Sequence, residues 1–221
     1  NTGTMTPYDI ALKYKSEDLT GEECELIFKQ LPKINFGKII PIIDNSGSMY
    51  DSEKYYLKAR AIGHYVSKNS SYMNNHIITF SKNPRLLELG GNYDSDMKIL
   101  ESIDGVTNTD FGKVMDLLSR VTEDLPDYLL VLSDMQFDEG SSLSKSEAMK
   151  VLQKRNPNLR IIWWNFNTRR VTFPETDEYG NIFLGGYNPF LLKFLEVGFN
   201  GQELINNIVN EYKEKMKGII K

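Results

Sequence analysis

The stretch that decides the fold runs from residue 39 to residue 49 and reads IIPIIDNSGSM. Its apolar first half, bounded by turn residues, is typical of a strand buried on both faces of a parallel sheet. Asp44 ends the apolar run, and Ser46 and Ser48 follow it at alternate positions. Open α/β sheets bind ligands at the carboxyl ends of their strands, so we expect these three side chains to gather at such an edge. All three offer hard oxygen donors, which favours Mg²⁺ or Mn²⁺ over zinc.

Two later segments complete a pattern. Residues 109–115 read TDFGKVM, with a threonine just before an amphipathic helix, and residues 129–134 read LLVLSD, an apolar strand that ends in an aspartate. The three segments together resemble the von Willebrand factor type A family, whose metal-ion-dependent adhesion site combines a DxSxS sequence, a helix-starting threonine and a strand-ending aspartate. Thr107 competes for the threonine role, but the apolar helix positions favour Thr109.

The context of these segments narrows the resemblance. Residues 108–111 read NTDF and residues 133–138 read SDMQFD. Both strings are similar to a poorly characterised family of plants and large DNA viruses that carries an A-like domain at its carboxyl end. The A domain of Ro/TROVE ribonucleoproteins is a more distant relative. The resemblance covers roughly residues 38–200, and it implies a doubly wound α/β fold.

The resemblance also implies a role for each site residue. Ser46 and Ser48 would bind the metal directly, and Thr109 would bind it directly or through water. Asp44 and Asp134 would act mostly through water, and a carboxylate from a protein partner would complete the octahedron. Neutral hydroxyl ligands leave the charge of the cation under-compensated, which agrees with capture of an external carboxylate.

Other interpretations of the same residues remain. Asp44, Ser46 and Ser48 could instead cap the helix that follows them. We interpret Asn45 and Gly47 as turn residues, with Gly47 tolerating unusual backbone angles.

Two further function classes stay open beside the metal-dependent, non-enzymatic binding module. The first is a magnesium-dependent phosphoryl-transfer hydrolase, whose acidic motif would begin with Asp44 at the end of the strand. Such enzymes commonly place a second acid two residues later, where this chain has Ser46. The chain also has no Gly-x-x-x-x-Gly-Lys-Ser/Thr loop for a nucleotide, and neither Ser46 nor Ser48 has a histidine partner nearby in the sequence. The second is a structural or virion scaffold with a vestigial metal site.

Composition bounds the remaining possibilities. The chain has 221 residues and a net charge of −4, which argues against direct nucleic-acid binding. It has no apolar run near the roughly 20 residues of a membrane helix.

A single cysteine, Cys24, rules out an internal disulfide and suits a reducing compartment. We therefore expect an intracellular, cytoplasmic protein, with a virion location as the alternative. The chain opens without methionine, and we expect a processed product or a fragment. The partner and the oligomeric state stay open.

The apolar patterns predict an α/β, doubly wound, mostly parallel sheet with helices on both faces. We expect a helical N-terminal segment over residues 1–36 and the A-like domain with C-terminal helices over residues 37–221. Strands are predicted at residues 39–44, 76–80, 85–89 (an edge), 128–133 and 160–166, with a β-hairpin over 172–187. Helices are predicted at residues 6–14, 20–31, 53–66, 94–103, 112–125, 144–155, 190–195 and 202–217.

Several single residues carry expectations of their own. Cys24 lies in an apolar helical stripe, so a buried structural cysteine is a better interpretation than a reactive thiol. His64 lies off the apolar stripe of its helix and is interpreted as a surface residue. Adjacent tryptophans, Trp163 and Trp164, should face opposite sides of a strand.

Expectations also attach to element ends. Asp94 is predicted to cap one short helix, and Ser144 to open another with Val151 facing inward. The hairpin over 172–187, including Glu178, is predicted to project on the same rim as Asp44.

Overall fold

Every residue of β1 (Ile39–Asp44) is buried, as a strand covered on both faces requires. Side chains alternate between the two faces of a strand. Accordingly Ile39 and Ile43 belong to one hydrophobic cluster, and Ile40 and Ile42 belong to another on the opposite face. The strand therefore runs through the middle of the molecule and separates two cores.

The fold was obtained as a computed structural model, which describes residues 5–50, 54–81, 83–103, 110–121, 124–135, 142–168, 172–177, 180–188 and 190–196. Thr109, Glu178 and the helix predicted over 202–217 lie outside these residues.

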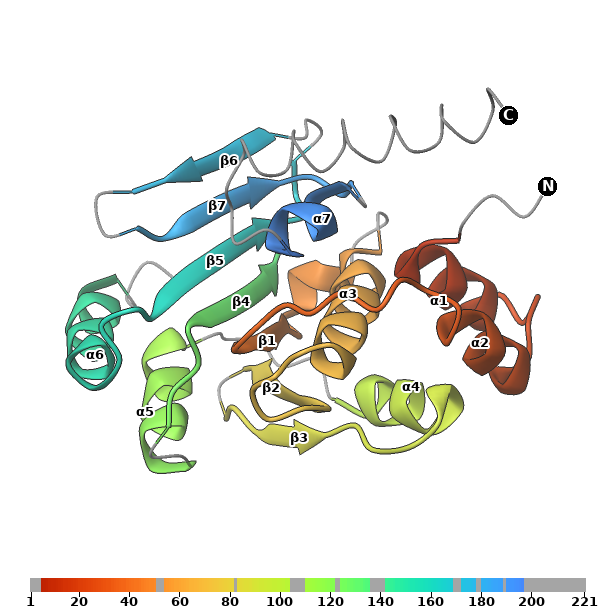
Figure 1. The fold of residues 1–221 in the computed structure, drawn as a ribbon, viewed down its shortest axis with the longest axis horizontal. Coiled ribbons are helices and arrows are strands. Elements are labelled where there is room, and N and C mark those ends of the chain that lie inside the picture. The colour runs from red at the N-terminus through yellow and green to blue at the C-terminus, as the bar shows by residue number, and fades with distance from the viewer. Residues whose placement is uncertain are drawn as a thin grey trace, which may run out of the picture.

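A seven-stranded sheet with the order β3-β2-β1-β4-β5-β7-β6 forms the centre of the fold (Figure 1). Its five inner strands run parallel, and each edge strand runs antiparallel to its neighbour. The parallel strands are β1, β2 (His76–Phe80), β4 (Tyr128–Ser133), β5 (Arg160–Asn165) and β7 (Ile182–Gly185), and the edges are β3 (Leu86–Glu88) and β6 (Thr172–Thr176). This arrangement confirms the predicted doubly wound, mostly parallel sheet.

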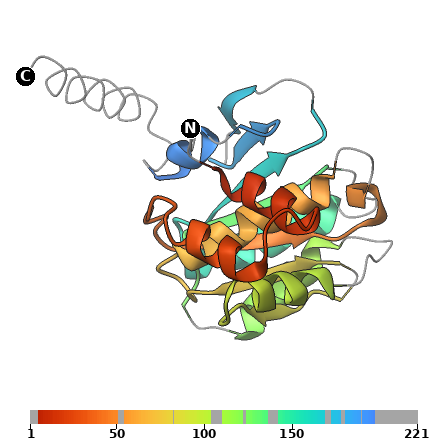
Figure 2. The same ribbon diagram turned by 90° about the vertical axis from the view of Figure 1, so that its right-hand side faces the viewer.

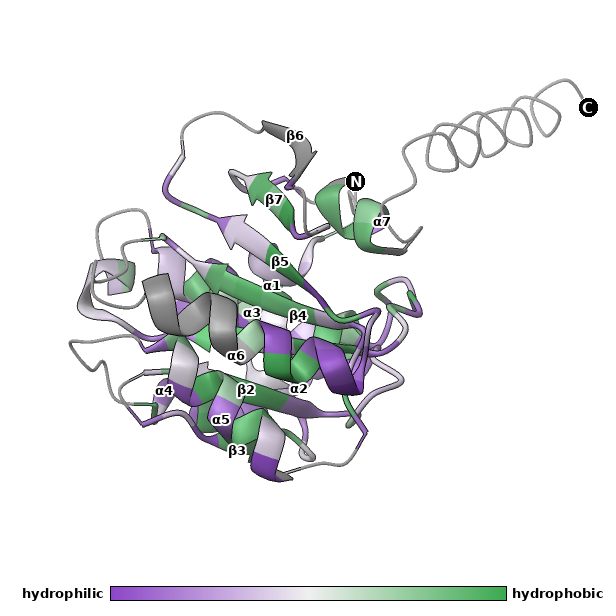
Figure 3. Cartoon of the chain, turned by 90° about the vertical axis from the view of Figure 1, so that its left-hand side faces the viewer, coloured by the Kyte–Doolittle hydropathy of each residue, from purple (hydrophilic) through white to green (hydrophobic). Residues whose placement is uncertain are grey.

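Helices cover both faces of the sheet (Figure 2). The helices on the side that carries Ile43 are α3 (Tyr55–Lys68), α4 (Tyr93–Glu101) and α7 (Phe190–Glu196), with α1 (Pro7–Lys15) and α2 (Gly21–Phe28) packed behind them. The face that carries Ile42 packs against α5 (Phe111–Val121) and α6 (Ser142–Arg155). Figure 3, seen from the side of α5 and α6, shows the hydrophobic colouring of the central strands β2 and β4. None of the described helices combines the length and apolarity needed to cross a lipid bilayer.

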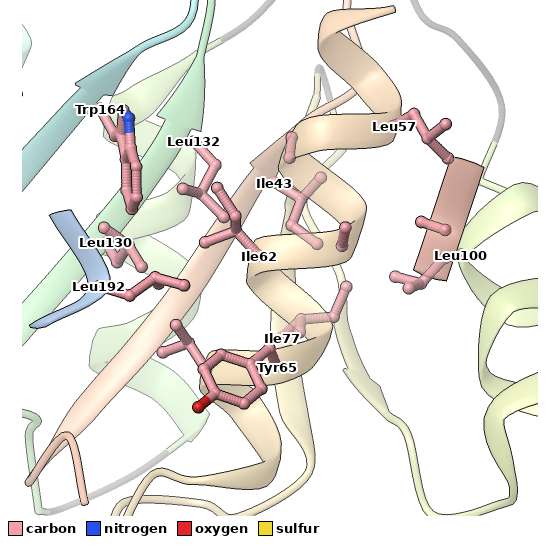
Figure 4. Packing of buried hydrophobic residues seen from close by; sticks show 14 of the residues in the cluster. Ile43, Leu57, Ile62, Tyr65, Ile77, Leu100, Leu130, Leu132, Trp164 and Leu192 are labelled. Atoms are coloured by element: carbon pink, nitrogen blue, oxygen red, sulfur yellow. The ribbon is translucent and has the colours of Figure 1, made fainter. Parts of the chain in front are cut away.

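The larger core gathers around α3 (Figure 4). Ile43, Leu130 and Leu132 project from the sheet toward Ile62 of α3, and Trp164 lies beside them. All five side chains are fully buried. Trp164 belongs to this cluster and Trp163 to the one on the opposite face, so the prediction that the two tryptophans face opposite sides of the sheet is confirmed.

The two N-terminal helices begin as the sequence predicts and join the same core. Thr6 and Thr20 each form a capping box, with Asp9 and Glu23 respectively. Helix α1 packs against α3, and α2 packs against α4. Cys24 is fully buried, and this burial raises the pKa of its thiol to about 11, as suits a structural cysteine.

The prediction that His64 is a surface residue is wrong. Its Nε2 atom lies 3.0 Å from Oδ2 of the buried Asp96, and Lys68 reaches the same oxygen at 2.7 Å. Phe28 of α2 covers the other side of the imidazole. Burial lowers the pKa of His64. The apolar stripe of α3 predicts only the side that faces the sheet, and α1, α2 and α4 bury most of the rest.

Smaller predictions also need correction. Asn92, rather than Asp94, is the N-cap of α4, because its side chain accepts a hydrogen bond from Ser95 N. Helix α6 begins at Ser142, two residues before the predicted start, and Val151 is 55% exposed instead of facing the core.

The hairpin of β6 and β7 does not project on the Asp44 rim. Both strands join the sheet, and their turn lies at the opposite end of the strands. There Asn181 accepts a hydrogen bond from Ile161 N, near the amino end of β5.

Candidate metal centre

Strand pairing brings the ends of β1 and β4 together. The two strands are parallel neighbours, and their register pairs Ile43 with Leu132, so that Asp44 and Ser133 come next to each other at the carboxyl edge. Ser133 Oγ donates a 2.5 Å hydrogen bond to Asp44 Oδ2, and Ser46 N donates a 2.8 Å hydrogen bond to Asp44 Oδ1. Both oxygens of this fully buried carboxyl group are therefore held in place.

The two predicted ligand serines lie side by side. Their Oγ atoms are 3.1 Å apart and form a hydrogen bond with each other. Adjacent ligands on an octahedral Mg²⁺, at 2.0–2.1 Å from the metal, are roughly 3 Å apart. Ser46 is 6% exposed and Ser48 is half-buried, so the pair opens toward the surface. The spacing and chemistry of these hydroxyls fit a small hard cation.

The 3₁₀ turn Gly47–Tyr50 carries Ser48. Met49 N donates to the Ser46 carbonyl at 3.1 Å, and the Met49 side chain is fully buried. The turn is therefore fastened to the core immediately after Ser48. This local structure explains why two serines in alternate positions can point to one spot.

Asp134 follows Ser133 at the same edge and is 2% exposed. The next residue, Met135, has a φ of 61°, which is rare for a residue with a side chain, and its N–H donates a 2.9 Å hydrogen bond to Ser133 Oγ. Ser133 thus joins the Asp44 carboxylate to the strained turn after β4. Strain of this kind collects at functional sites.

Burial sets the charge state of the metal-free centre. It raises the pKa of Asp44 from 3.8 to about 6, although hydrogen bonds from Ser133 and Ser46 favour the ionised form. The nearby Asp134 raises the pKa further. The ionised form of Asp44 is therefore unfavourable by itself, and a divalent cation between this carboxyl group and solvent would favour it. In this respect too the residues fit a metal.

The start of α5 lies at the same edge. Phe111 contacts Phe80, whose backbone pairs with Asp44, with their ring centroids 5.9 Å apart. Asp110 Oδ1 accepts hydrogen bonds from Gly112 N at 2.9 Å and from Lys113 N at 3.4 Å, so Asp110 caps the helix. Thr109 immediately precedes this cap and lies outside the described residues. Its predicted role as a ligand stays a prediction.

The structure separates two interpretations of the serines. Helix α3 has Lys54 as its N-cap, without a side-chain hydrogen bond to the helix. Asp44, Ser46 and Ser48 therefore do not cap the helix that follows them. The interpretation of Gly47 is wrong: its φ is not positive, and a Cβ atom there would meet nothing within 4 Å. Gly47 is exposed, and apart from its two neighbours in the chain nothing lies within 4 Å of the place where a Cβ atom would be.

Sequence reasoning missed Ser133 as a partner of Asp44. The signal was present, because two parallel strands that both end in polar residues align those residues when the register is known. Among the described residues, no three His, Cys, Asp or Glu side chains group as metal ligands do. The candidate centre is built on serine hydroxyls instead, so a search for clusters of His, Cys, Asp and Glu does not identify it.

Comparisons with known proteins agree with the fold. The crystal structure of the Deinococcus radiodurans RO (RSR) protein is similar with a TM-score of 0.59 and 16% identity, covering 89% of this chain and 45% of that chain. The chain thus spans less than half the length of this relative. At this identity the similarity shows the fold alone, which is von Willebrand factor A-like.

A second structure is more loosely similar. An aerotolerance-related membrane protein from Bacteroides fragilis NCTC 9343, crystallised with multiple mutations to serine, has a TM-score of 0.37 and 16% identity, covering 74% of this chain and 88% of that chain. This superposition is too loose to carry an argument. No curated protein matches the sequence of this chain.

One family model matches, over residues 38–219, and it is described as a domain of unknown function, DUF7788. The matched residues include β1, the serine turn and Asp134, so the candidate centre lies within the family domain. The match spans well over half of the sequence, and the chain therefore belongs to the DUF7788 family.

Proposed function

We propose that this protein is a non-enzymatic binding module that uses Mg²⁺ or Mn²⁺ at a metal-ion-dependent adhesion site to capture an acidic residue of a protein partner. The observation that carries the proposal is the 3.1 Å spacing of the Ser46 and Ser48 hydroxyls above the fixed Asp44 carboxylate. Ser46 and Ser48 would bind the cation directly, joined by Thr109. Asp44 and Asp134 would act from behind them, through water.

The chemistry of the donors supports capture of an anion. Both hydroxyls are neutral, and both Asp44 oxygens already accept hydrogen bonds from the protein. A cation held mainly by neutral oxygens keeps most of its positive charge. A carboxylate that approaches from outside is then attracted strongly, and Gly47, which lies between the two serines in the sequence, is exposed and has open space around it. A site ringed by ionised carboxylates would lack this attraction.

A magnesium-dependent phosphoryl-transfer hydrolase is the alternative from another class. Ser46 stands where such enzymes commonly place a second acid. The two histidines of the chain also have other partners: His64 Nε2 contacts Asp96, and His76 Nδ1 contacts the Asn74 carbonyl. These contacts favour the binding module, because neither imidazole contacts Ser46 or Ser48 as a general base would. Turnover of a phosphatase substrate panel with magnesium would favour the hydrolase.

Titration with Mn²⁺ alone tests the metal site, with electron paramagnetic resonance reporting the free ion. Wild type should bind one ion, and the Ser46→Ala, Ser48→Ala double variant should not. The matched control replaces two exposed serines away from the site, Ser71 and Ser102, with alanine and should bind as wild type does. Equal binding by wild type and the site double variant would place the ion elsewhere.

The partner is tested by recovery from native lysate on immobilised protein, with magnesium and with chelator. Proteins captured only with magnesium, and only by a chain with both Ser46 and Ser48, support the proposal. If every captured protein survives both chelation and the double substitution, the metal site is not the binding surface.

A further inference from the structure

A buried arginine lies near the candidate metal centre. Arg60 is in the second turn of α3 and is only 3% exposed. Arginine is almost never buried to this degree unless its guanidinium is engaged. None of the hydrogen bonds given above for the candidate metal site involves Arg60, so the contacts of its guanidinium indicate its role.

The guanidinium of Arg60 holds two tyrosine rings. It donates a 2.7 Å hydrogen bond from Nη2 to the Tyr50 hydroxyl. Its Cζ atom lies 5.7 Å from the centroid of the Tyr50 ring and 5.1 Å from that of Tyr56. The two rings stack on each other with centroids 4.7 Å apart and an angle of 13°. Tyr56 and Arg60 are four residues apart on α3, so one helical face presents both to Tyr50.

Tyr50 is the last residue of the 3₁₀ turn that carries Ser48. The turn is fastened on one side by the buried Met49 and on the other by Tyr50, which is 42% exposed and is held through its contacts with Arg60 and Tyr56. Ser48 immediately precedes these two anchors. A rotation of the turn would move the Ser48 hydroxyl away from that of Ser46. Mg²⁺ and Mn²⁺ sites tolerate little such displacement.

We propose that Arg60 is a positioning residue of the metal centre, which acts by clamping Tyr50 and so holds the Ser48 hydroxyl in place. This inference rests on the proposed function, since it assigns a support to the same site. It makes the metal affinity depend on a side chain that contacts neither the metal nor its ligands.

Loss of the clamp and loss of the positive charge of Arg60 should change the metal affinity in opposite directions. Arg60 is positive, so removal of its charge should by itself tighten the binding of a nearby cation. Removal of a clamp on a ligand should instead weaken that binding, commonly by roughly tenfold or more. The direction of change in metal affinity therefore separates the two roles, and a loss of folding alone is checked by thermal melting.

The experiment measures Mn²⁺ affinity by electron paramagnetic resonance for three variants of the whole chain. Tyr50→Phe keeps the stacked ring and the charge of Arg60 but removes the clamped hydroxyl, and we expect its Kd to rise severalfold. Arg60→Met removes the whole clamp, and we expect its Kd to rise roughly tenfold or more. Tyr56→Phe is the matched control, because its hydroxyl makes no hydrogen bond to the described residues, and its Kd should stay within about twofold of wild type.

Hydrogen–deuterium exchange of the peptide over residues 45–50 gives a second readout without metal. Exchange should be faster in Tyr50→Phe than in Tyr56→Phe. An unchanged Kd in Tyr50→Phe, or a lower Kd in Arg60→Met, overturns the clamp and leaves the metal site standing. Absence of Mn²⁺ binding to wild type overturns the proposed metal site, and the clamp with it. If Arg60→Met fails to fold, Tyr50→Phe decides.

Discussion

Replacement of Asp44 by asparagine should make the metal-free protein more stable while removing its response to metal. Asp44 is fully buried, and both of its oxygens accept hydrogen bonds. Asparagine has nearly the same shape and carries no charge. It keeps an acceptor for Ser46 N, and its amide can donate to Ser133 Oγ. The substitution therefore removes the buried charge with little change in packing.

The magnitude follows from the pKa of Asp44, which burial raises from 3.8 to about 6. The raised pKa means that folding favours the protonated acid. The contribution of Asp44 to the unfolding free energy of the metal-free wild type is therefore highest below pH 4 and is lost as the pH rises through 6. This rise in pKa corresponds to roughly 3 kcal/mol at pH 8. For a chain of this size, each kcal/mol changes Tm by roughly 2–4 °C.

The assay is thermal unfolding of wild type and Asp44→Asn between pH 4.5 and pH 8, in chelator and in millimolar magnesium. In chelator, the Tm of Asp44→Asn should rise relative to that of wild type as the pH rises, by roughly 6–12 °C at pH 8. Magnesium should raise the Tm of wild type at pH 8 and leave that of Asp44→Asn unchanged. A difference in Tm between the two proteins that does not vary with pH would refute the reasoning about Asp44.

Other predictions test the remaining parts of the account. Leu132→Ala should lower the unfolding free energy by roughly 2–5 kcal/mol in urea denaturation, and a loss below about 1 kcal/mol would contradict its place in the central core. Thr109→Ala should abolish magnesium-dependent partner capture with little change in Tm, because Asp110 caps α5; a large drop in Tm would make Thr109 a structural residue. Gly47→Ala should keep both Tm and Mn²⁺ affinity but weaken partner recovery, since its new methyl group would point into open space, and unchanged recovery would place the partner elsewhere. Glu178→Ala should leave recovery unaltered, as measured beside wild type, because its described neighbours Asp177 and Gly180 lie at the opposite end of the strands from Asp44.

The central strands were predictable because burial on both faces leaves an unmistakable apolar run. Residues 39–43 and 129–132 are such runs, and both form inner strands of the sheet. The N-terminal helices were predictable from local chemistry, since Pro7 marks the first helical position of one and the capping box of Thr20 and Glu23 marks the start of the other. In these places local preference and tertiary structure agree.

The errors arose where a third layer or a strand pairing decides the outcome. His64 was misread because the helices packed behind α3 bury the side that the apolar stripe leaves out. The hairpin was misplaced because only the pairing of β7 with β5 shows that its turn lies at the opposite edge. Val151 follows the helical period but lies where α6 faces away from the core.

Within the candidate site, the sequence predicted the residue types better than their contacts. Asp44, Ser46, Ser48 and Asp134 lie at one edge, as expected for the ends of β1 and β4. The hydrogen bond between Ser133 and Asp44 depends on the register of two strands distant in sequence. The proposed positioning of Tyr50 by Arg60 likewise depends on where α3 packs, which cannot be predicted from residue spacing in the sequence.

The most direct test of the central claim is a crystal structure grown with Mn²⁺, with data collected at the manganese absorption edge. If Ser46 and Ser48 bind the metal, one anomalous peak should lie within about 2.2 Å of their hydroxyl oxygens, on the side away from the core. A well-ordered site without a peak at saturating Mn²⁺, or a peak at other residues only, would contradict that claim.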